Sequence, residues 1–551
     1  MENIVALGIV VLGILLSLYI SYYHRRSTSS TANFYVAGGG ISPRINGMAM
    51  FGDYASAASF LGVAGAVALM GVDGWWLALG FFAAWIVVLL VIAGPLKNVG
   101  KFTVADVLNS RYEGSERGIR MIAMISTLVL CVMYLVPQIV GAGLLFNLLL
   151  GWDYLPTVIV TGSLMAIFVI MGGMKGTSYN QAVQGAILFG ALMFLLIFGI
   201  VSFFGGNPVG MVIEGKDIVP PVLAAKNPEA VAAIAGMTSM DAFQALGTSE
   251  AVAVSASAVE SVRGIMTEAP SAITPGVGLR DLMNNASLVL ALFLGVLGLP
   301  HILIRFYTVS SAKDARKSAE FTIWGLAIFY GSVFFVGLIA MYALYPVLVE
   351  LLAAGQRGVA TNMTMPMLGQ MMGGQVLLGV IAAGAMAAML STSAGLLISA
   401  TTSLSHDLYK GVLSPNSTDA EQVRFAKIGA GTLAVIAIAM SIWLKEQNVA
   451  MLVAMCFGIA ASTFAPALVF AVWWRKLTSQ AVIWGMTVGL ISSLLFTFAR
   501  FFGEKTMLGL DVLVNPALYS VPLAVIVTIV VSYVTSDRGK TDEFMAQAHG
   551  K

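Results

Sequence analysis

The chain has 551 residues, of which 58% are hydrophobic and only 10% are charged, and its formal net charge is +2. Soluble globular domains usually carry about 25% charged residues. This composition therefore excludes a water-soluble fold and predicts an all-α polytopic membrane protein. A net charge this small gives no indication of nucleic-acid binding.

About thirteen apolar runs reach the length that a helix needs to cross a bilayer. In chain order they are 4–22, 46–70, 75–96, 120–149, 155–173, 178–204, 286–307, 321–352, 375–404, 425–444, 449–473, 480–500 and 516–535. The first run follows Met1-Glu2-Asn3 without a basic segment or a cleavage site, so we expect a retained helix. The runs 321–352 and 375–404 are long enough for tilt or for extension beyond the lipid.

Lys and Arg residues are distributed unequally between the predicted loops. With the N-terminus outside, 21 of the 29 basic residues fall in inner loops and ends, four in short outer loops and four in segment 205–285. Basic residues are enriched in cytoplasmic loops. The sequence thus predicts an outer N-terminus and a cytoplasmic C-terminus, in a multi-pass protein of a bacterial-type plasma (inner) membrane.

Segment 205–285 is the one large region outside the predicted spans. Its Ala/Val/Ser-rich stretch around 251–262 predicts a short external helix with a linker. On the inner side, 101–112 and 311–320 are predicted as short amphipathic connectors. The tail after Asp537 is brief and polar.

The sequence gives no indication of an enzyme. Both cysteines, Cys131 and Cys456, lie in apolar runs and are predicted to be packing residues. The four histidines are far apart and show no metal-ligand spacing. We find no nucleotide-binding loop and no nucleophile–base arrangement outside the spans, and expect no cofactor.

Two spans, the second and the seventh, carry signals of a discontinuous helix. The 286–307 run contains Gly295, Gly298 and Pro300, and the 46–70 run has glycines around Asp53 and Ser56, namely Gly47, Gly52, Gly62 and Gly65. Interrupted helices in corresponding positions indicate an inverted-repeat transporter with its site near the membrane midplane. Close helix packing is the alternative, which we favour for Gly62 and Gly65.

Ser391 and Thr392 place two hydroxyls inside the apolar 375–404 run. The carbonyl of Ala388 lies three and four residues earlier on the same helix face, so three oxygens can converge on a small hard cation. Carbonyls freed by unwinding near Gly52 and Ala55 would complete the shell. Alternatively, both hydroxyls bond back to a carbonyl one turn earlier, and the pair taken alone favours this interpretation.

Several separate motifs resemble the sodium:solute symporter family. They are Gly172-Gly173-Met174-Lys175-Gly176 followed by Tyr179 to Gln184, and Gly298-Leu299-Pro300-His301-Ile302-Leu303-Ile304-Arg305-Phe306. Residues 52–62, 299–316 and 405–409 resemble its cation/acetate symporter branch. The resemblance covers nearly all of 33–535.

The resemblance implies a five-plus-five inverted-repeat (LeuT-like) core with two broken helices. The implied parts are an accessory helix and cytoplasmic loop in 1–45, a first repeat in 46–204, an extracytoplasmic loop in 205–285, a second repeat in 286–474, accessory helices in 475–535 and a cytoplasmic tail in 536–551. It also implies a Na+ site made by the carbonyls of Gly52, Ala55 and Ala388 and the hydroxyls of Ser391 and Thr392. Na+ is the implied coupling ion for import of acetate or another short-chain monocarboxylate.

Two positions depart from the family pattern. Gln181 stands where many members have an acidic residue, and Asp53 lies one position earlier than the carboxylate of proline-transporting relatives. Gln181 therefore supplies no carboxylate waypoint for the ion. Asp53 is a candidate for an ion path or for proton coupling.

A small carboxylate needs hydrogen-bond donors or a positive field, which a half-helix N-terminus supplies. Ser56, Ser59, Gln138 and His301 are the predicted substrate-binding residues, the first two lying just past the expected break. Arg305 is interpreted as a cytoplasmic-end arginine that snorkels or pairs internally, rather than as a carboxylate clamp. Tyr134 and Trp75-Trp76 are interpreted as packing and interface aromatics.

Three other functions stay open at this point. A proton-coupled monocarboxylate carrier would use Asp53 or His301 as the titrating group. A Na+-coupled symporter of another small solute, such as an amino acid, differs only in its substrate. A transporter-like sensor would need an output domain, for which we find no sequence. The expected partners are the solute, Na+ and the lipid bilayer.

Overall fold

The computed structural model describes residues 3–25, 30–112, 116–214, 217–235, 237, 248–274, 282–445, 447–537 and 539–550. Within these residues, ten helices are long and apolar enough to cross a membrane, and the number rises to twelve if each of two bent helix pairs forms one span. The ten are α1 (Ile4–His24), α5 (Val72–Val91), α8 (Glu116–Leu150), α9 (Tyr154–Phe204), α17 (Ala312–Ala343), α20 (Thr364–Ser403), α21 (Asp419–Trp443), α22 (Val449–Trp473), α23 (Ser479–Phe501) and α24 (Ala517–Val534).

Both predicted broken spans are confirmed as bent helix pairs. α3 (Pro43–Tyr54) is bent by 59° from the segment Ala58–Met70, which comprises η3 (Ala58–Gly62) and α4 (Val63–Met70). The chain leaves helical geometry at Ala55, where ψ is 72°.

The second bend, of 41°, separates Leu282–Gly298 from Pro300–Thr308. These segments comprise α15 (Leu282–Gly295) with η4 (Val296–Gly298), and α16 (Pro300–Leu303) with η5 (Ile304–Thr308). Leu299 is extended at the bend, with φ −84° and ψ 106°, because a proline disfavours helical geometry in the residue before it.

The predicted count of thirteen spans is not confirmed, because two of the predicted runs lie in one helix. α9 unites the predicted runs 155–173 and 178–204 in one element of 51 residues whose backbone is non-helical at Gly173. The prediction of one helix over 321–352 is wrong, because α17 ends at Ala343 and α18 (Tyr345–Ala353) begins after Leu344. Pro346 in the first turn of α18 cannot supply the backbone N–H that a continuous helix needs.

Short elements connect the long helices and cover the two ends of the bundle. They are α2 (Thr31–Val36), η2 (Ala37–Gly39), α6 (Ala93–Val99), α7 (Val104–Asn109), α10 (Pro208–Glu214), α11 (Pro221–Ala224), α12 (Pro228–Ile234), α14 (Thr248–Ile265), α19 (Arg357–Asn362), η6 (Leu404–Leu413), α25 (Thr541–Ala548) and a hairpin of β1 (Thr506–Met507) and β2 (Leu510–Asp511). The predicted external helix around 251–262 corresponds to α14 and the connector 101–112 to α7. The connector 311–320 is instead the first part of α17. Residues 215–216, 236, 238–247 and 275–281 of segment 205–285 lie outside the described residues.

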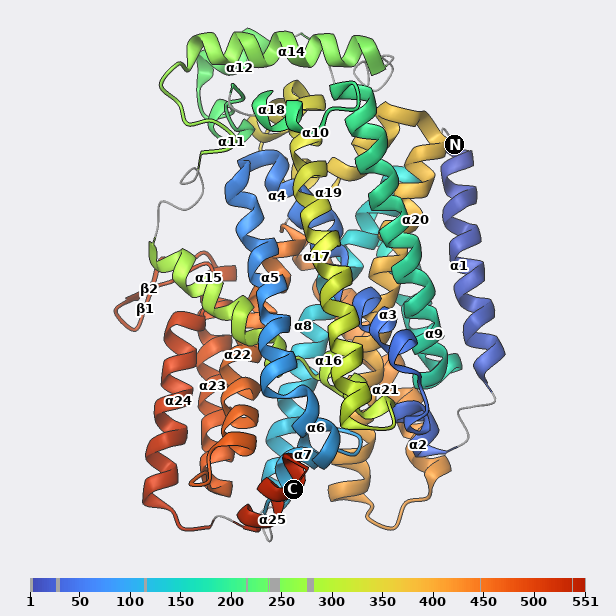
Figure 1. Cartoon of the computed structure of the whole chain (residues 1–551), viewed down its shortest axis with the longest axis vertical. Helices are drawn as coiled ribbons and strands as arrows, with labels where there is room; N and C mark the ends of the chain where they lie inside the picture. Colours follow the sequence, from blue (N-terminus) through green and yellow to red (C-terminus); the bar gives the residue numbers. More distant parts are fainter. Residues whose placement is uncertain are drawn as a thin grey trace.

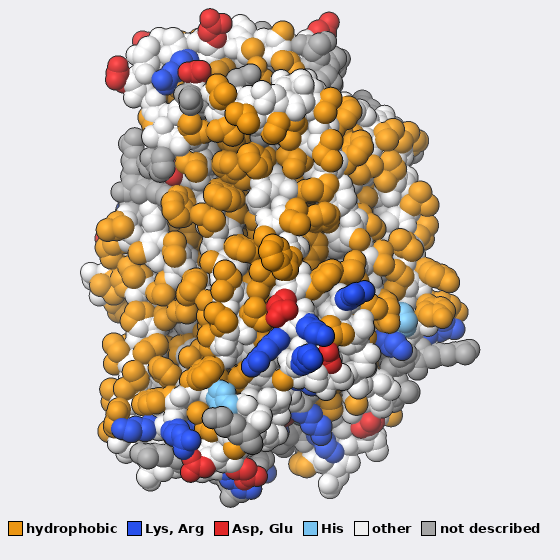
Figure 2. Space-filling model, in the orientation of Figure 1, with side chains coloured by type: hydrophobic (Ala, Val, Ile, Leu, Met, Phe, Trp, Pro, Cys, Tyr) orange, Lys and Arg blue, Asp and Glu red, His pale blue; other side chains and the backbone are white. Residues whose placement is uncertain are grey.

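The two chain ends lie at opposite ends of the long axis (Figure 1). α11, α12 and α14 cover the end near the N-terminus, while α6, α7 and α25 lie at the other end, which we call the C-terminal face. Figure 2 shows hydrophobic side chains over the middle of the visible face and Lys and Arg side chains mainly toward the C-terminal face. An apolar belt between two polar ends is the surface that a bilayer requires.

The polar tail after Asp537 packs back onto the C-terminal face through α25. The Lys540 N–H donates to the Arg111 carbonyl at 2.8 Å. The Asn98 side chain donates to the Ala548 carbonyl at 3.0 Å. The tail is therefore part of the folded bundle.

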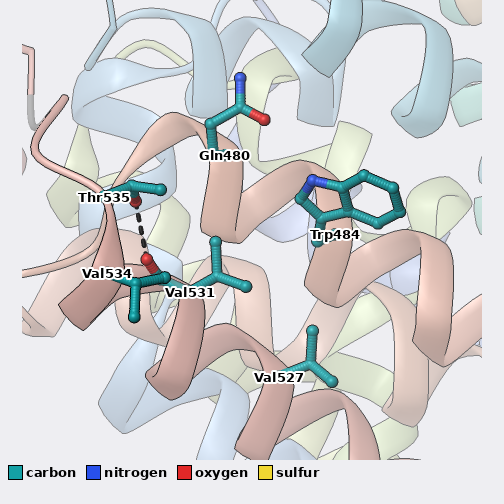
Figure 3. Close-up of a pocket in the computed structure, with 6 residues that line it drawn as sticks. All are labelled: Gln480, Trp484, Val527, Val531, Val534 and Thr535. Atoms are coloured by element: carbon teal, nitrogen blue, oxygen red, sulfur yellow. Dashed lines mark hydrogen bonds between the residues drawn. The ribbon is translucent and has the colours of Figure 1, made fainter.

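A shallow hollow of about 360 Å³ lies between α23 and α24 (Figure 3). Its lining is mostly apolar and comprises Gln480, Trp484, Val527, Val531, Val534 and Thr535. The Thr535 hydroxyl donates to the carbonyl of Val531 in its own helix at 2.7 Å. Trp484 and Val534 are 53% and 74% exposed, so this hollow belongs to the outer apolar surface and not to the buried site described next.

Candidate ion and substrate site

One of the predicted ion-binding residues, Thr392, contacts the end of α3. Thr392 Oγ1 donates to the backbone carbonyl of Asp53 at 2.5 Å, which joins the middle of α20 to the last turn of α3. The Ser391 hydroxyl is fully buried and has no hydrogen-bond partner among the described residues. We call Gly52, Ala55, Ala388, Ser391 and Thr392 the ion half.

The break at the end of α3 takes a carbonyl of the ion half out of the regular helix pattern. The Ser56 N–H donates to the Tyr54 carbonyl at 2.8 Å, whereas a regular helix would direct it to the Gly52 carbonyl four residues earlier. Oxygen atoms are the ligands that hard cations take. The Gly52 carbonyl therefore loses its regular helical partner one residue before the Asp53 carbonyl that Thr392 contacts.

Thr392 and Thr401 both lie in α20, but their hydroxyls donate to different helices. Thr401 Oγ1 donates to the Leu397 carbonyl of its own helix at 2.7 Å, as the alternative interpretation expected for Thr392. A hydroxyl that donates to Asp53 keeps its own lone pairs available for a cation. The geometry at Thr392 is therefore compatible with ion binding.

A fully buried ion pair lies beside the ion half. Asp53 Oδ2 is 3.4 Å from both Nε and Nη2 of Arg305, and both side chains are 0% exposed. Arg305 Nη1 donates to Ser178 Oγ at 2.7 Å, and Nη2 donates to Gln181 Oε1. Gln181 Nε2 in turn donates to the Ser391 carbonyl at 2.7 Å. Charged groups inside a membrane protein are rare and mark functional sites.

Glycines allow the helices that carry this pair to approach closely. A Cβ at Gly395 in α20 would lie 2.4 Å from both carboxylate oxygens of Asp53. A Cβ at Gly52 would lie 2.2 Å from the Gln181 carbonyl. Gly62 and Gly65 also pack closely, since their Cβ atoms would lie 2.6 Å from the Ala450 Cβ and 1.8 Å from the Thr361 carbonyl.

The snorkelling interpretation of Arg305 is wrong, and its alternative of internal pairing is right. The side chain does not reach the surface, because Asp53, Ser178 and Gln181 surround its guanidinium. Sequence reasoning missed that its partner would be Asp53. A signal was available in the sequence, because Asp53 is the only charged residue in the run 46–70 and Arg305 the only one in the run 286–307.

Three of the four predicted substrate residues lie around Tyr134, which the sequence reading treated as a packing residue. The His301 ring packs edge-on against the Tyr134 ring with centroids 5.2 Å apart. The Ser56 side chain neighbours the Tyr134 hydroxyl. Gln138, one turn after Tyr134 in α8, accepts from the Ala57 N–H at 3.3 Å. We call Ser56, Tyr134, Gln138 and His301 the substrate half.

The substrate half contains buried polar atoms that lack hydrogen-bond partners among the described residues. They are Gln138 Nε2 and both ring nitrogens of His301, and these side chains are 0% exposed. Leaving a buried polar group unpaired costs about 1–3 kcal/mol. Such groups suit a small polar solute that would accept from them.

The fourth predicted residue, Ser59, lies apart from these atoms. Its hydroxyl shares a 2.8 Å hydrogen bond with Tyr330 Oη and lies 3.4 Å from the Tyr54 carbonyl. Phe457 packs against Tyr134 and Tyr54 with ring centroids 6.0 and 6.1 Å apart. Ser59 therefore belongs to the aromatic wall next to the substrate half.

A second charged network lies at the C-terminal face. Arg120 Nη1 is 3.1 Å from Asp106 Oδ1 and 2.9 Å from Asp407 Oδ1, and His406 Nε2 is 3.0 Å from Asp106 Oδ1. We call these four residues the peripheral network. Its two carboxylates and His406 could hold a metal ion by distance, a grouping that sequence spacing did not predict. The Arg120 guanidinium already pairs with both carboxylates, so the geometry defines an ion-pair network.

The surroundings of Asp106 affect its acidity in opposite directions. Burial acts to raise the pKa of its carboxyl, but the His406 ring, the Arg120 charge and the Phe102 N–H hold that pKa below its usual range. The same carboxylate accepts from the Thr103 N–H at 3.2 Å and completes the cap of α7. Asp106 therefore stays ionised near neutral pH.

A helical membrane protein in which two broken helices meet around buried polar groups has the architecture of a secondary transporter. The family model of the sodium:solute symporter family matches residues 34–489. The chain belongs to this family. It is a multi-pass membrane symporter for Na+ and a small solute, and not an enzyme.

Two relatives match almost the whole chain. The monocarboxylic acid transporter of Corynebacterium glutamicum is 35% identical over 537 residues, covering 95% of this chain and 90% of that protein. The uncharacterized symporter YwcA of Bacillus subtilis is 34% identical over 550 residues, covering 97% of this chain and 96% of that protein.

Solved structures share the fold at low sequence identity. A Na+-coupled sialic acid symporter in a substrate-bound, outward-open state aligns with a TM-score of 0.71 at 14% identity, over 97% of this chain and 99% of that one. A nucleobase-cation-symport-1 family transporter in a closed conformation aligns with a TM-score of 0.50 at 11% identity, over 94% of this chain and 99% of that one. The predicted LeuT-like transporter fold is thereby confirmed.

Proposed function

We propose that the protein imports acetate or another short-chain monocarboxylate together with Na+ by alternating access. The observation that carries this proposal is the Ser391 hydroxyl, which lies beside the Thr392–Asp53 contact and has no hydrogen-bond partner in the part of the chain that the structure describes. It lies next to a substrate half whose buried polar atoms also lack partners among these described residues. The similarity to a monocarboxylic acid transporter supports the choice of substrate class.

In this proposal Na+ takes the hydroxyls of Ser391 and Thr392 and the carbonyls of Gly52, Ala55 and Ala388. The substrate carboxylate accepts from Gln138 Nε2, His301 and the Ser56 hydroxyl, and Phe457 closes one side of the space. Ser59 supports this wall through Tyr330. Asp53 acts through its charge on Arg305 and not as a proton carrier.

The proposal extends to the organisation of the chain. Residues 46–204 and 286–474 form the two inverted repeats, an arrangement supported by the bends in the second and seventh predicted spans. The N-terminus lies outside and the C-terminus in the cytoplasm of a bacterial-type inner membrane. The chain ends lie toward opposite ends of the molecule, which supports placing them on opposite sides of the membrane (Figure 1). The Lys and Arg side chains mainly toward the C-terminal face support a cytoplasmic C-terminus (Figure 2).

Charge determines how much work the membrane potential contributes. One Na+ moving with one monocarboxylate anion carries no net charge, so the potential contributes nothing. Each tenfold Na+ gradient then supplies about 1.4 kcal/mol, enough for about tenfold accumulation of the substrate.

Uptake of radiolabelled acetate into proteoliposomes tests this function. We expect an inward Na+ gradient to drive uptake and a proton gradient alone to fail, with propionate and pyruvate competing better than proline. Uptake driven equally well by protons alone would contradict Na+ coupling. Uptake of proline but not of acetate would contradict the substrate class.

A further inference from the structure

We propose that the buried Asp53–Arg305 pair makes the substrate half respond to occupancy of the ion half. The pair acts as a positioning pair, since neither side chain is assigned to the substrate. This inference rests on the proposed function, because it assumes that Na+ and solute bind in the two halves defined above.

Arg305 connects its own segment, Pro300–Thr308, to two other helices through one guanidinium. Its donors reach Asp53 in α3 and Ser178 in α9, and it also donates to Gln181 in α9. The backbone around it is fixed to α3 as well, because Asn46 Nδ2 donates to the Arg305 carbonyl at 3.1 Å. A movement of α3 or α9 therefore displaces the segment Pro300–Thr308.

Two of these partners, Asp53 and Gln181, also contact the ion half directly. The Asp53 carbonyl accepts from Thr392 Oγ1 at 2.5 Å, while its carboxylate holds Arg305. Gln181 accepts from Arg305 with Oε1 and donates to the Ser391 carbonyl with Nε2. Two routes thus run from the Ser391–Thr392 pair to the same guanidinium.

The other end of this connection is His301 in the substrate half. His301 precedes Arg305 by four residues in the segment Pro300–Thr308, about one helical turn. A cation that draws oxygens of α3 and α20 together would shift Asp53 and Gln181, and with them Arg305 and His301. In this way Na+ would prepare the His301 ring for the substrate.

The buried location gives the pair its rigidity. Arg305 and Asp53 are 0% exposed, so bulk water does not reach either partner in this structure. An arginine presents several donors in a fixed planar fork, which transmits direction as well as charge. A neutral hydrogen-bonded pair at these positions would keep the volume but lose this constraint.

A labelling experiment that needs no substrate tests the inference. A His301→Cys variant is made with both native cysteines, Cys131 and Cys456, replaced by alanine. Its reaction rate with a small maleimide is measured in Na+ and in choline. We expect Na+ to change the rate by about fivefold or more, within the range of typical coupling between two sites.

The same measurement is repeated with Asp53→Asn/Arg305→Gln, which removes both charges together and leaves no unpaired ion. We expect the labelling rate to become equal in Na+ and choline. Arg305→Lys keeps the charge but loses the fork, and we expect an intermediate Na+ effect. This second variant decides the question if the neutral pair fails to fold.

Thr322→Val serves as the matched control. Thr322 Oγ1 donates to the Gly47 carbonyl at 3.1 Å, so this variant removes another buried bond to α3 that does not involve the pair. Its Na+ effect should equal that of the parent. An equal Na+ effect with and without the charged pair, or no Na+ effect in the parent, would overturn the inference. Either result would leave Na+-driven acetate uptake, which is measured separately, as the test of the proposed function.

Discussion

The Asp53–Arg305 pair and the peripheral network use the same ion-pair chemistry in different surroundings. Both members of the central pair are 0% exposed, and Asp53 and Gln181 connect the pair to the ion half. In the peripheral network the exposed side-chain fractions are 18% for Arg120 and 10% for Asp106. There, Asp106 caps the start of α7 through Thr103.

This difference shows that the neighbours of an ion pair, more than its chemistry, indicate its role. A buried pair is weak evidence for stability in itself, because desolvation offsets much of the attraction. The central pair contacts the ion half, and we therefore assign it a role in coupling the ion half to the substrate half. The contacts of the peripheral network are helix ends and a cap, so we assign it a structural role.

The largest expected difference between the two regions is in stability. Arg305→Gln leaves Asp53 charged and buried without its counter-ion, and we expect a loss of about 3–5 kcal/mol. Arg120→Gln should cost about 1–3 kcal/mol, because Asp407 keeps hydrogen bonds from Thr103 and Ser403. Thermal unfolding of the purified protein in detergent measures both losses. A larger loss for Arg120→Gln would reverse the comparison.

Alanine substitutions at Gly395 and Gly411 test how tightly the structure packs around Asp53 and around Arg120. In Gly395→Ala the new methyl group would lie 2.4 Å from both Asp53 oxygens. We expect Na+-driven uptake to fall by about tenfold or more, equivalent to ~1.4 kcal/mol. In Gly411→Ala the methyl group meets Arg120 Cδ at 2.8 Å, a flexible chain that can move, and uptake should change less than about twofold. Equal uptake in the two variants would contradict this distinction.

The smallest expected effect is the pH dependence of the peripheral network. The pKa of Asp106 is held below its usual range in the folded protein, so its contribution to stability is present above the unfolded pKa of about 3.9 and is lost as pH falls further. The network also contains Asp407, a second buried carboxylate on the same Arg120, so the comparison is made above about pH 7. There the difference in melting temperature between the wild type and Asp106→Asn should stay constant up to about pH 8. A difference that already shrinks between about pH 8 and 7 would contradict the lowered pKa of Asp106.

Glycine and proline positions made much of the fold predictable from the sequence. The bends at Ala55 and Leu299 fall in the two spans that were predicted to be broken, because Pro300 and the glycines around Asp53 are local signals. The end of α17 at Ala343 was missed, although Pro346 follows it. Hydropathy does not reveal where α17 ends, because the residues before and after Ala343 are both apolar.

The site was predictable only in part, because its contacts join distant parts of the chain. Ser391, Thr392, Ser56, Gln138 and His301 were identified as polar residues in apolar runs. The bond from Thr392 to the Asp53 carbonyl spans 339 residues, and no spacing rule predicts it. The role of Tyr134 was missed for the same reason, since its contact with His301 exists only in the folded bundle.

The central claim is that the hydroxyls of Ser391 and Thr392 bind the coupling ion. The Na+ dependence of acetate uptake in Ser391→Ala/Thr392→Ala proteoliposomes tests it most directly, with Thr401→Ala as a control that removes a hydroxyl bonded within the same helix. We expect half-maximal uptake in the double variant to need about tenfold more Na+ or more, a loss of at least ~1.4 kcal/mol, while the control resembles the wild type. An unchanged Na+ dependence in a folded double variant would contradict the claim.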